Sequence, residues 1–153
     1  MMESTLIAPG GADELRACNP NDLPWAPWAM QGAYFKLLSA DAESGRFTLL
    51  IRLQTGCIAP NHRHLGAVEG MVLEGGFFYA DNPQVRYTAG MYLFEPAGSV
   101  HQPVSPDGAL MFAVFHGPVE GIDSDGRVMG RVGCKWHIDA WNAAIGALAA
   151  KEN

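Results

Sequence analysis

Residues 56–76 read GCIAPNHRHLGAVEGMVLEGG, and two histidines one residue apart stand near the centre of this stretch. In a β-strand, residues i and i+2 point to the same face, so we expect His62 and His64 to project into one space while Arg63 faces away. Neutral imidazole nitrogens bind metal ions at about 2.1 Å, and two parallel rings can converge on one ion. If the two strands of this stretch pair, the Glu69 carboxylate can sit beside the two rings.

A third histidine closes the downstream segment GMYLFEPAGSVH, residues 90–101. The glycines and the proline of this segment are expected to bend the chain and to turn the imidazole of His101 inward. Together with His62 and His64 it would form a set of three neutral nitrogen ligands. The sequence therefore predicts a metal centre built from two separate segments.

The spacing of residues in both segments resembles the two sequence motifs of the cupin superfamily. The first motif is matched in all five positions: Gly56, His62, His64, Glu69 and Gly76. The second motif is matched in four positions: Gly90, Pro96, Gly98 and His101. It departs from the usual pattern at its last position, where Ser105 replaces asparagine. The resemblance implies a double-stranded β-helix, or jelly roll, that carries a metal site.

Short β-segments separated by turn residues agree with this fold independently. Residues 47–54 alternate between two faces with the period of a strand. EGMVLEGGFFYAD, residues 69–81, is interpreted as two strands joined at Gly75 and Gly76, because glycine tolerates the positive φ of hairpin turns. ALMFAVFHG, residues 109–117, is interpreted as the last apolar strand. We therefore expect an all-β cupin jelly roll.

We divide the chain into an N-terminal arm (1–33), a barrel (34–118) and a C-terminal extension with one helix (119–153), all within one domain. Glycines and prolines indicate that the arm is irregular. Its Trp25 and Trp28 are expected to cover the outside of a sheet or to fill a subunit interface, with a role in the substrate site as the alternative. The period of Trp141 and Ile145 predicts a terminal amphipathic helix on the exterior of the barrel, with Asp139 as its N-cap.

A narrower resemblance is to small single-domain dioxygenases of the ChrR-like cupin group, which cleave carbon–carbon bonds in acetylacetone or dihydroxyacetophenone. LPW (residues 23–25) and KLL (36–38) carry it before the first motif, and FHGPVEGIDSDGRVMG (115–130) carries it after the second. The resemblance implies that His62, His64 and His101 bind a non-haem Fe(II). Glu69 is then either a fourth ligand or a hydrogen-bond acceptor beside the ligands.

Three neutral imidazoles would leave a divalent ion its full charge and open coordination positions. Such an ion acts as a Lewis acid and would favour the enolate of a bound diketone or hydroxyketone. We therefore expect a dioxygenase that cleaves a carbon–carbon bond of such a ketone with O₂. Fe(II) is the expected metal, although zinc or nickel can replace it during isolation.

Further site residues are expected around the metal centre. Met111 and Phe115 share one face of the last strand, and the resemblance implies that this face lines the substrate pocket. Glu95 either positions a water or the substrate or lies at an exposed edge. Gln102 directly follows His101 and is expected to donate a hydrogen bond to oxygen or substrate.

Composition limits the partners. Ten basic and sixteen acidic residues give a formal net charge of −6 in a chain of 153 residues, without a basic cluster, so neither nucleic acid nor a membrane surface is expected. Three widely spaced cysteines, without an export signal, favour a reducing cytoplasm. Beyond the ketone and O₂, the expected partner is a second copy of the chain, in a homodimer or homotetramer.

Two alternatives stay open. One is a zinc-binding sensor or binding module similar to the cupin domains of anti-sigma factors, although those carry a separate helical segment. The other is a metal-dependent isomerase or hydrolase on a sugar-like substrate. That substrate would require more polar residues than the strand LMFAVF, residues 110–115, provides.

Overall fold

The computed structural model describes residue 15 and residues 17–152, so residues 1–14 of the predicted arm lie outside the described part. The elements follow one another as η1 (Pro20–Asp22), β1 (Ala26–Pro27), β2 (Ala33–Ala40), β3 (Phe47–Leu53), β4 (Cys57–Ile58), β5 (His62–His64), β6 (Val68–Tyr79), β7 (Asn82–Thr88), β8 (Tyr92–Glu95), β9 (Val100–His101), β10 (Pro103–Ser105), β11 (Ala109–Phe115), β12 (Val119–Ile122), β13 (Val128–Val132) and α1 (Cys134–Lys151).

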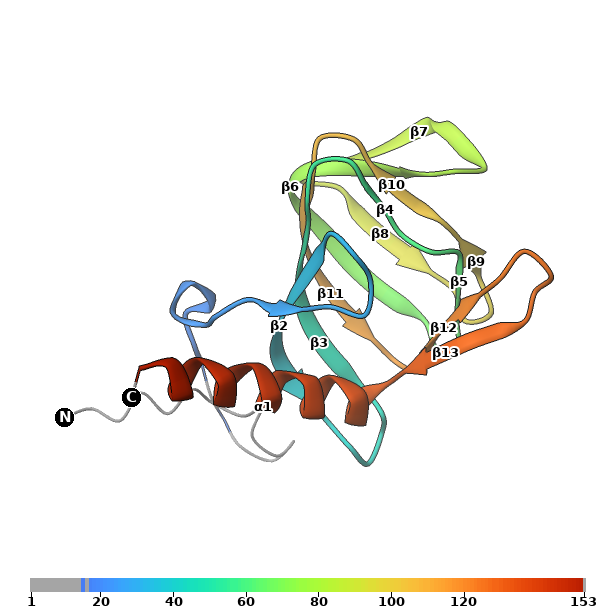
Figure 1. Ribbon diagram of the computed structural model, residues 1–153. Helices are drawn as coiled ribbons and strands as arrows, with labels where there is room; N and C mark the ends of the chain where they lie inside the picture. Colours follow the sequence, from blue (N-terminus) through green and yellow to red (C-terminus); the bar gives the residue numbers. More distant parts are fainter. Residues whose placement is uncertain (1–14, 16, 153) are drawn as a thin grey trace.

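Two antiparallel sheets curl around a common interior (Figure 1). The larger sheet has the order β1-β2-β3-β11-β6-β10-β4, and β7 and β8 also pair with β6. The smaller sheet has the order β13-β12-β5-β9. This arrangement confirms the predicted all-β jelly roll with one C-terminal helix.

The interior follows the alternation read from the sequence. Phe47, Leu49 and Ile51 on β3 are buried, as is Phe115 on the neighbouring β11. Burying each such side chain contributes about 1.5–3 kcal/mol relative to leaving it exposed. The inward faces of β3 and β11 therefore form a large part of the apolar core of the barrel.

The strand β6 corrects one prediction. The expected hairpin at Gly75 and Gly76 is wrong, because β6 runs unbroken from Val68 to Tyr79. The register between β6 and β11 shifts at Leu73, two residues before Gly75, which has a φ of 65°. After this bulge the strand exchanges β11 and β8 for β10 and β7 as partners. Ser105, which departs from the cupin motif, donates a hydrogen bond of 2.7 Å to the Gly76 carbonyl and so fixes the bend.

The β12–β13 hairpin lies beyond the segment predicted as barrel and nevertheless joins the smaller sheet. Val119 and Gly121 of β12 pair with His64 and His62 of β5. The sequence DSDGR forms the polar turn between β12 and β13, in which the Asp123 carboxylate accepts from backbone amides. This hairpin extends one wall of the barrel.

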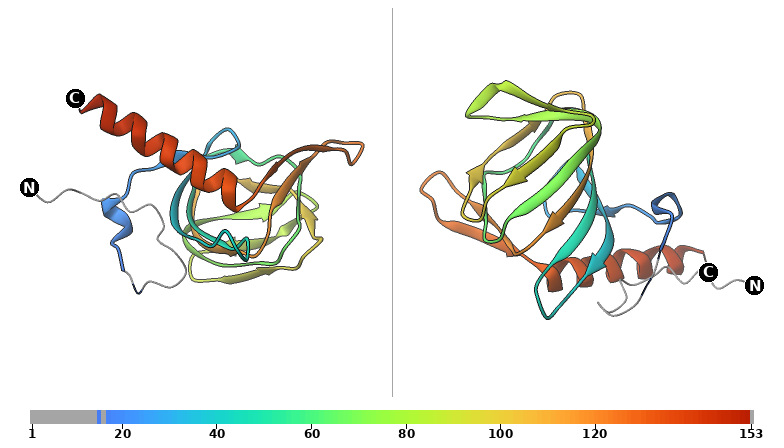
Figure 2. Two further views of the ribbon diagram at one scale, coloured as in Figure 1. Left: turned by 90° about the horizontal axis from the view of Figure 1, so that it is seen from below. Right: turned by 180° about the vertical axis from the view of Figure 1, so that it is seen from behind.

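The helix α1 lies along the outside of the barrel, beside the ends of β2 and β13 (Figure 2). It begins at Cys134 with Gly133 as its N-cap, so the prediction of Asp139 as N-cap is wrong. Asp139 instead pairs with Lys135 one turn earlier, at 2.7 Å. Among the described residues, no helix combines the length and apolarity that crossing a membrane requires.

Candidate metal centre and cavity

The three histidines predicted as ligands lie together. His62 and His64 belong to β5, and His101 belongs to β9, which pairs with β5 so that His62 lies directly opposite His101. One ring nitrogen from each residue lies within 4.8 Å of the other two. Arg63, between the first two histidines, points away and approaches Glu120 at 3.7 Å. The period-2 geometry of β5 thus produces a cluster that could hold one metal ion.

The spacing of the nitrogens fits a shared ion. The Nε2 atoms of His64 and His101 are 3.1 Å apart. Two nitrogens bound to one ion at about 2.1 Å and at right angles would lie about 3.0 Å apart. His64 and His101 therefore have the donor type and the separation that a divalent transition metal requires, and a nitrogen of His62 lies within 4.8 Å of both.

A backbone hydrogen bond fixes the tautomer of His62, the remaining candidate ligand. Its Nδ1 lies 3.0 Å from the Pro60 carbonyl oxygen, which can only accept, so Nδ1 carries the proton. Burial lowers the pKa of His62 to about 4, against the opposing effect of that hydrogen bond. The ring is therefore neutral near pH 7 and keeps a lone pair on Nε2 for a metal.

Glu95 is the carboxylate of this site. Its Oε2 lies 2.8 Å from Nε2 of His64 and 3.2 Å from Nε2 of His101, and it is largely buried rather than at an exposed edge. Burial favours a raised pKa, but hydrogen bonds from His101 and His64 hold the pKa of Glu95 below its usual range. The side chain is therefore an anion directly beside the candidate ligands.

Tyr79 holds the other oxygen of this carboxylate and was not predicted as a site residue. Its hydroxyl donates to Oε1 of Glu95 at 2.5 Å, and its ring lies 4.5 Å from that of His101. Burial raises the pKa of Tyr79, and the charge of Glu95 adds to this, so the phenol stays protonated as a donor. No spacing signal marks Tyr79, because it reaches the site from the far end of β6.

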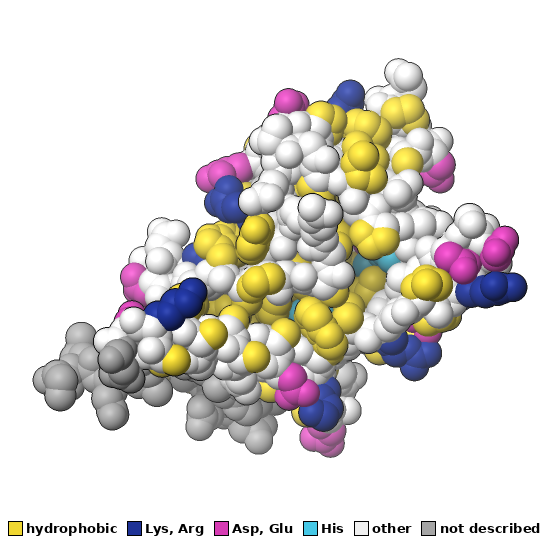
Figure 3. Space-filling model, viewed as in Figure 1, with side chains coloured by type: hydrophobic (Ala, Val, Ile, Leu, Met, Phe, Trp, Pro, Cys, Tyr) yellow, Lys and Arg dark blue, Asp and Glu magenta, His cyan; other side chains and the backbone are white. Residues whose placement is uncertain are grey.

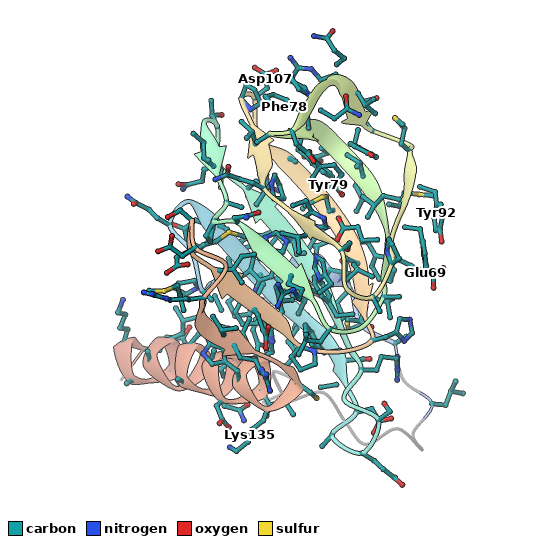
Figure 4. The ribbon with its side chains drawn as sticks, turned by 90° about the vertical axis from the view of Figure 1, so that its right-hand side faces the viewer. Glu69, Phe78, Tyr79, Tyr92, Asp107 and Lys135 are labelled. Carbon is teal, nitrogen blue, oxygen red and sulfur yellow. The ribbon has the colours of Figure 1, made fainter. Side chains whose placement is uncertain are left out.

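Glu69 does not take part in the cluster, which corrects its prediction as a ligand or catalytic residue. β5 and β6 belong to different sheets, so the assumed pairing of the two strands does not exist. The side chain of Glu69 is 49% exposed and accepts a hydrogen bond of 2.6 Å from the Tyr92 hydroxyl. Figure 4 shows Glu69 and Tyr92 together at the edge of the molecule, whereas Tyr79 lies inside the barrel.

Gln102 has a different partner from the one predicted. Its Nε2 donates to the Ala59 carbonyl oxygen at 3.0 Å. This bond ties the segment after His101 to the segment before His62. Gln102 therefore supports the backbone on which the histidines are placed.

A cavity of about 470 Å³ adjoins the cluster, and its lining includes His62, His64 and Glu95. Met111 and Phe115, predicted as walls of the substrate pocket, both line it. Figure 3 shows histidine side chains among hydrophobic ones in the hollowed face above α1. The candidate metal centre therefore opens onto an apolar space.

Trp28 also lines this cavity, which corrects its main expected place outside the sheet or in a subunit interface and agrees with the alternative of a role in the substrate site. Its indole Nε1 donates to Nε2 of His137 at 2.9 Å, which directs the ring to the interior. Trp25 does cover the outside of the larger sheet, where Lys36 and Arg52 stack over its ring at 4.5 and 5.2 Å. We predicted one role for both tryptophans because both lie in the same short arm.

The fold and the three-histidine cluster define a cupin with a candidate metal centre. The chain belongs to the ChrR cupin-like domain family, whose model matches residues 13–120. This match confirms the resemblance inferred from the two motifs.

Individual relatives agree with this family. An acetylacetone-cleaving enzyme from Acinetobacter johnsonii is 26% identical over 126 residues, which cover 80% of this chain and 78% of the relative. The crystal structure of an acetylacetone dioxygenase from the same organism superposes with a TM-score of 0.76 at 24% identity, covering 86% of this chain and 93% of the other. An RmlC-like cupin from Ralstonia eutropha JMP134 gives a TM-score of 0.81 at 22% identity and covers 88% of each chain.

Proposed function

We propose that this protein is a mononuclear, non-haem Fe(II)-dependent dioxygenase that cleaves a carbon–carbon bond of a small diketone or hydroxyketone with O₂. The observation that carries this proposal is a cluster of three histidines, two of which, His62 and His64, line an apolar cavity. The similarity to an acetylacetone-cleaving enzyme supports the choice of reaction. The products are two carbonyl or carboxylate fragments that together contain both atoms of O₂.

In this proposal His62, His64 and His101 hold the metal. When bound, Fe(II) would supply Lewis acidity toward the ketone oxygens and redox chemistry toward O₂. Glu95 places a negative charge beside two of the ligands. Tyr79 orients this carboxylate, and the apolar walls exclude water from the reacting atoms.

The proposal is tested by loading the protein with Fe(II) under anaerobic conditions and measuring oxygen uptake with a panel of diketones and hydroxyketones. Metal content is measured on the same samples, because zinc or nickel can occupy a nitrogen-rich site during purification. We expect substrate-dependent uptake that scales with iron content. Full iron occupancy without any such uptake would overturn the proposed reaction.

A matched pair of histidine variants distinguishes a metal ligand from a histidine that does not bind the metal. His101→Gln should lose both iron and oxygen uptake, because it removes one of three nitrogens. His116→Gln is the control, since the His116 side chain is 45% exposed and its ion-pair partner among the described residues is the surface carboxylate of Glu69, at 3.9 Å. Equal loss in both variants would contradict the assignment of the site.

We propose further that the chain forms a homodimer or homotetramer in the cytoplasm. Four exposed apolar side chains of neighbouring strands, here called the apolar sheet face, support assembly: Met71, Tyr92, Phe94 and Phe112. The free thiols of Cys18, Cys57 and Cys134 support a reducing compartment.

A further inference from the structure

The cavity is larger than a ligand such as acetylacetone would fill. Its volume of about 470 Å³ lies in the range of about 300–1,000 Å³ that is typical of sites for drug-sized ligands. Part of its wall comes from outside the strands that carry the histidines. The arm supplies Trp28 and Met30, β13 supplies Met129, and α1 supplies Trp136.

The indole of Trp28 is held in one orientation. Its Nε1 can only donate, so Nε2 of His137 must be the acceptor and Nδ1 must carry the ring proton. Nδ1 in turn donates to the Gly133 carbonyl oxygen at 2.7 Å. His137 is fully buried on α1, and burial lowers its pKa to about 4, which keeps the acceptor nitrogen free of a proton near pH 7.

A series of packed rings connects this hydrogen bond to the metal centre. Phe115 contacts both His64 and Trp28, with ring centroids 6.1 and 6.3 Å away. Phe47 stacks on Phe115 at 4.8 Å and on His137 at 4.2 Å. A substituent that extends from a ketone at the histidines along this wall would meet Phe115 first and Trp28 next.

The wall also indicates what kind of substituent fits. Aromatic side chains pack favourably against other rings in offset or edge-to-face arrangements. Of the described residues that line the cavity, Arg131 is the one Lys or Arg, and its guanidinium pairs with the buried Glu120. An uncharged aryl group is therefore a better match than a carboxylate or phosphate.

We propose that Trp28, held by His137, determines substrate specificity by limiting the size of the apolar substituent on the ketone. This inference rests on the proposed function of the same site and adds a specificity-determining residue. The relevant ligand property is the length of the substituent on the ketone.

The test measures binding to the zinc-loaded protein by isothermal titration calorimetry, so that it does not depend on turnover. The ligands are acetylacetone, 1-phenyl-1,3-butanedione and 1,3-diphenyl-1,3-propanedione. In the unsubstituted protein we expect the monophenyl ligand to bind about tenfold more tightly than acetylacetone. Trp28→Leu should raise the affinity for the diphenyl ligand, relative to that for the monophenyl ligand, by about tenfold. It should change the affinity for acetylacetone by no more than about twofold.

Two further variants keep the result interpretable. Trp28→Phe retains a ring but loses the donor to His137, and it should shift the same ratio in the same direction by a smaller factor. Trp25→Phe alters a tryptophan of the same arm that stacks under Lys36 and Arg52, and it should leave the ratio unchanged. Zinc content and circular dichroism establish that each variant is folded and loaded.

The inference is overturned if Trp28→Leu weakens all three ligands equally, or if acetylacetone binds as tightly as the monophenyl ligand. Either result would mean that Trp28 serves only the fold or that the cavity does not select by size. These outcomes are distinct from those of the oxygen-uptake assay. Size selection without oxygen uptake would refute the proposed dioxygenase reaction and keep the role of Trp28. Oxygen uptake without size selection would keep the reaction and refute the role of Trp28.

Discussion

Two glutamates of this chain have opposite surroundings, although the sequence motif singles out only one of them. Glu69 occupies the motif position and lies on the outer face of β6, hydrogen-bonded to Tyr92. Glu95 lies on β8 and reaches the histidines with one oxygen while Tyr79 holds the other. Proximity in sequence to the HxH pair is therefore a poor guide to proximity in space here.

This difference gives a first prediction. Glu95→Gln should weaken zinc binding by about 10–100-fold, because a carboxylate beside the ligating histidines orients them and compensates the charge of the ion. Glu69→Gln should leave zinc binding unchanged. Competition with a chromophoric chelator measures both affinities, and a larger effect of Glu69→Gln would restore the motif glutamate as a ligand.

A second prediction concerns pH. Burial lowers the pKa of both His137 and His62 to about 4, below the value of about 6.5 for an exposed histidine. Between these pH values the two histidines are protonated in the unfolded chain but not in the folded metal-free protein. The free energy of unfolding should therefore fall as the pH falls from about 6.5 toward 4. Each histidine contributes up to about 1.4 kcal/mol per pH unit in that window.

Urea unfolding of the metal-free protein at pH 7.5, 6.0 and 5.0 measures this dependence. His137→Gln removes one of the two groups and should therefore show the shallower fall. The lowered pKa of Glu95 acts mainly below about pH 4.5, where stability is lost as the carboxylate is protonated, so it contributes little in the measured range. Identical slopes in the two proteins would contradict a neutral, buried His137.

At the scale of elements, β6 shows why a glycine pattern in sequence is ambiguous. Two adjacent glycines between apolar runs fit a tight hairpin and also fit a bulge within one strand. The choice depends on partners far away in the sequence. The carbonyl oxygen of Gly108, just before β11, lies only 2.1 Å from where a Cβ on Gly75 would stand, so this close approach requires a glycine there.

This close approach gives a third prediction. Gly75→Ala and Gly90→Ala both place a Cβ at positive φ, 65° and 90°, which costs about 1–2 kcal/mol each. Only at Gly75 would the new methyl group also collide with backbone, whereas nothing lies within 4 Å at Gly90. Gly75→Ala should therefore lower the free energy of unfolding by at least about 2 kcal/mol more than Gly90→Ala, as measured by urea unfolding. Equal losses would show that the bulge adapts to a side chain.

The helix α1 was predicted from the spacing of Trp141 and Ile145, but its beginning was not. Its N-cap, Gly133, makes no side-chain hydrogen bond, so the first turn lacks the polar capping signal that sequence reasoning uses. Asp139 carries that signal and lies inside the helix instead. The buried His137 was not expected as the partner of Trp28, because their contact spans 109 residues of sequence.

For the whole molecule, the sequence predicted what depends on local spacing and missed what depends on assembly of the two sheets. The jelly roll and the histidine cluster follow from strand alternation and from the two motifs. The places of Glu95, Tyr79 and Trp28 depend on which strands pair and on where the arm returns to the barrel. Those are long-range relations that a single sequence does not carry in its periodicity.

A fourth prediction concerns assembly through the apolar sheet face. Phe94 on this face is 56% exposed and lies opposite Glu69. Phe94→Lys should shift the protein toward the monomer in size-exclusion chromatography with light scattering, because it places a charge in an apolar contact. Val128→Lys, on the distant β13, changes a residue that is 51% exposed and should have no such effect. A monomeric unsubstituted protein would contradict the proposed assembly.

The cavity wall is built from two parts of the chain, and this affects both how relatives can diverge and how the protein can be engineered. The metal centre lies wholly within the region that defines the family, residues 13–120, but β13 and α1 lie after it and still contribute Met129 and Trp136 to the wall. Relatives can therefore keep identical histidines while their last segments diverge. If the proposed function holds, exchanging residues 121–152 between two such proteins should transfer the preference among ketones and leave the reaction unchanged.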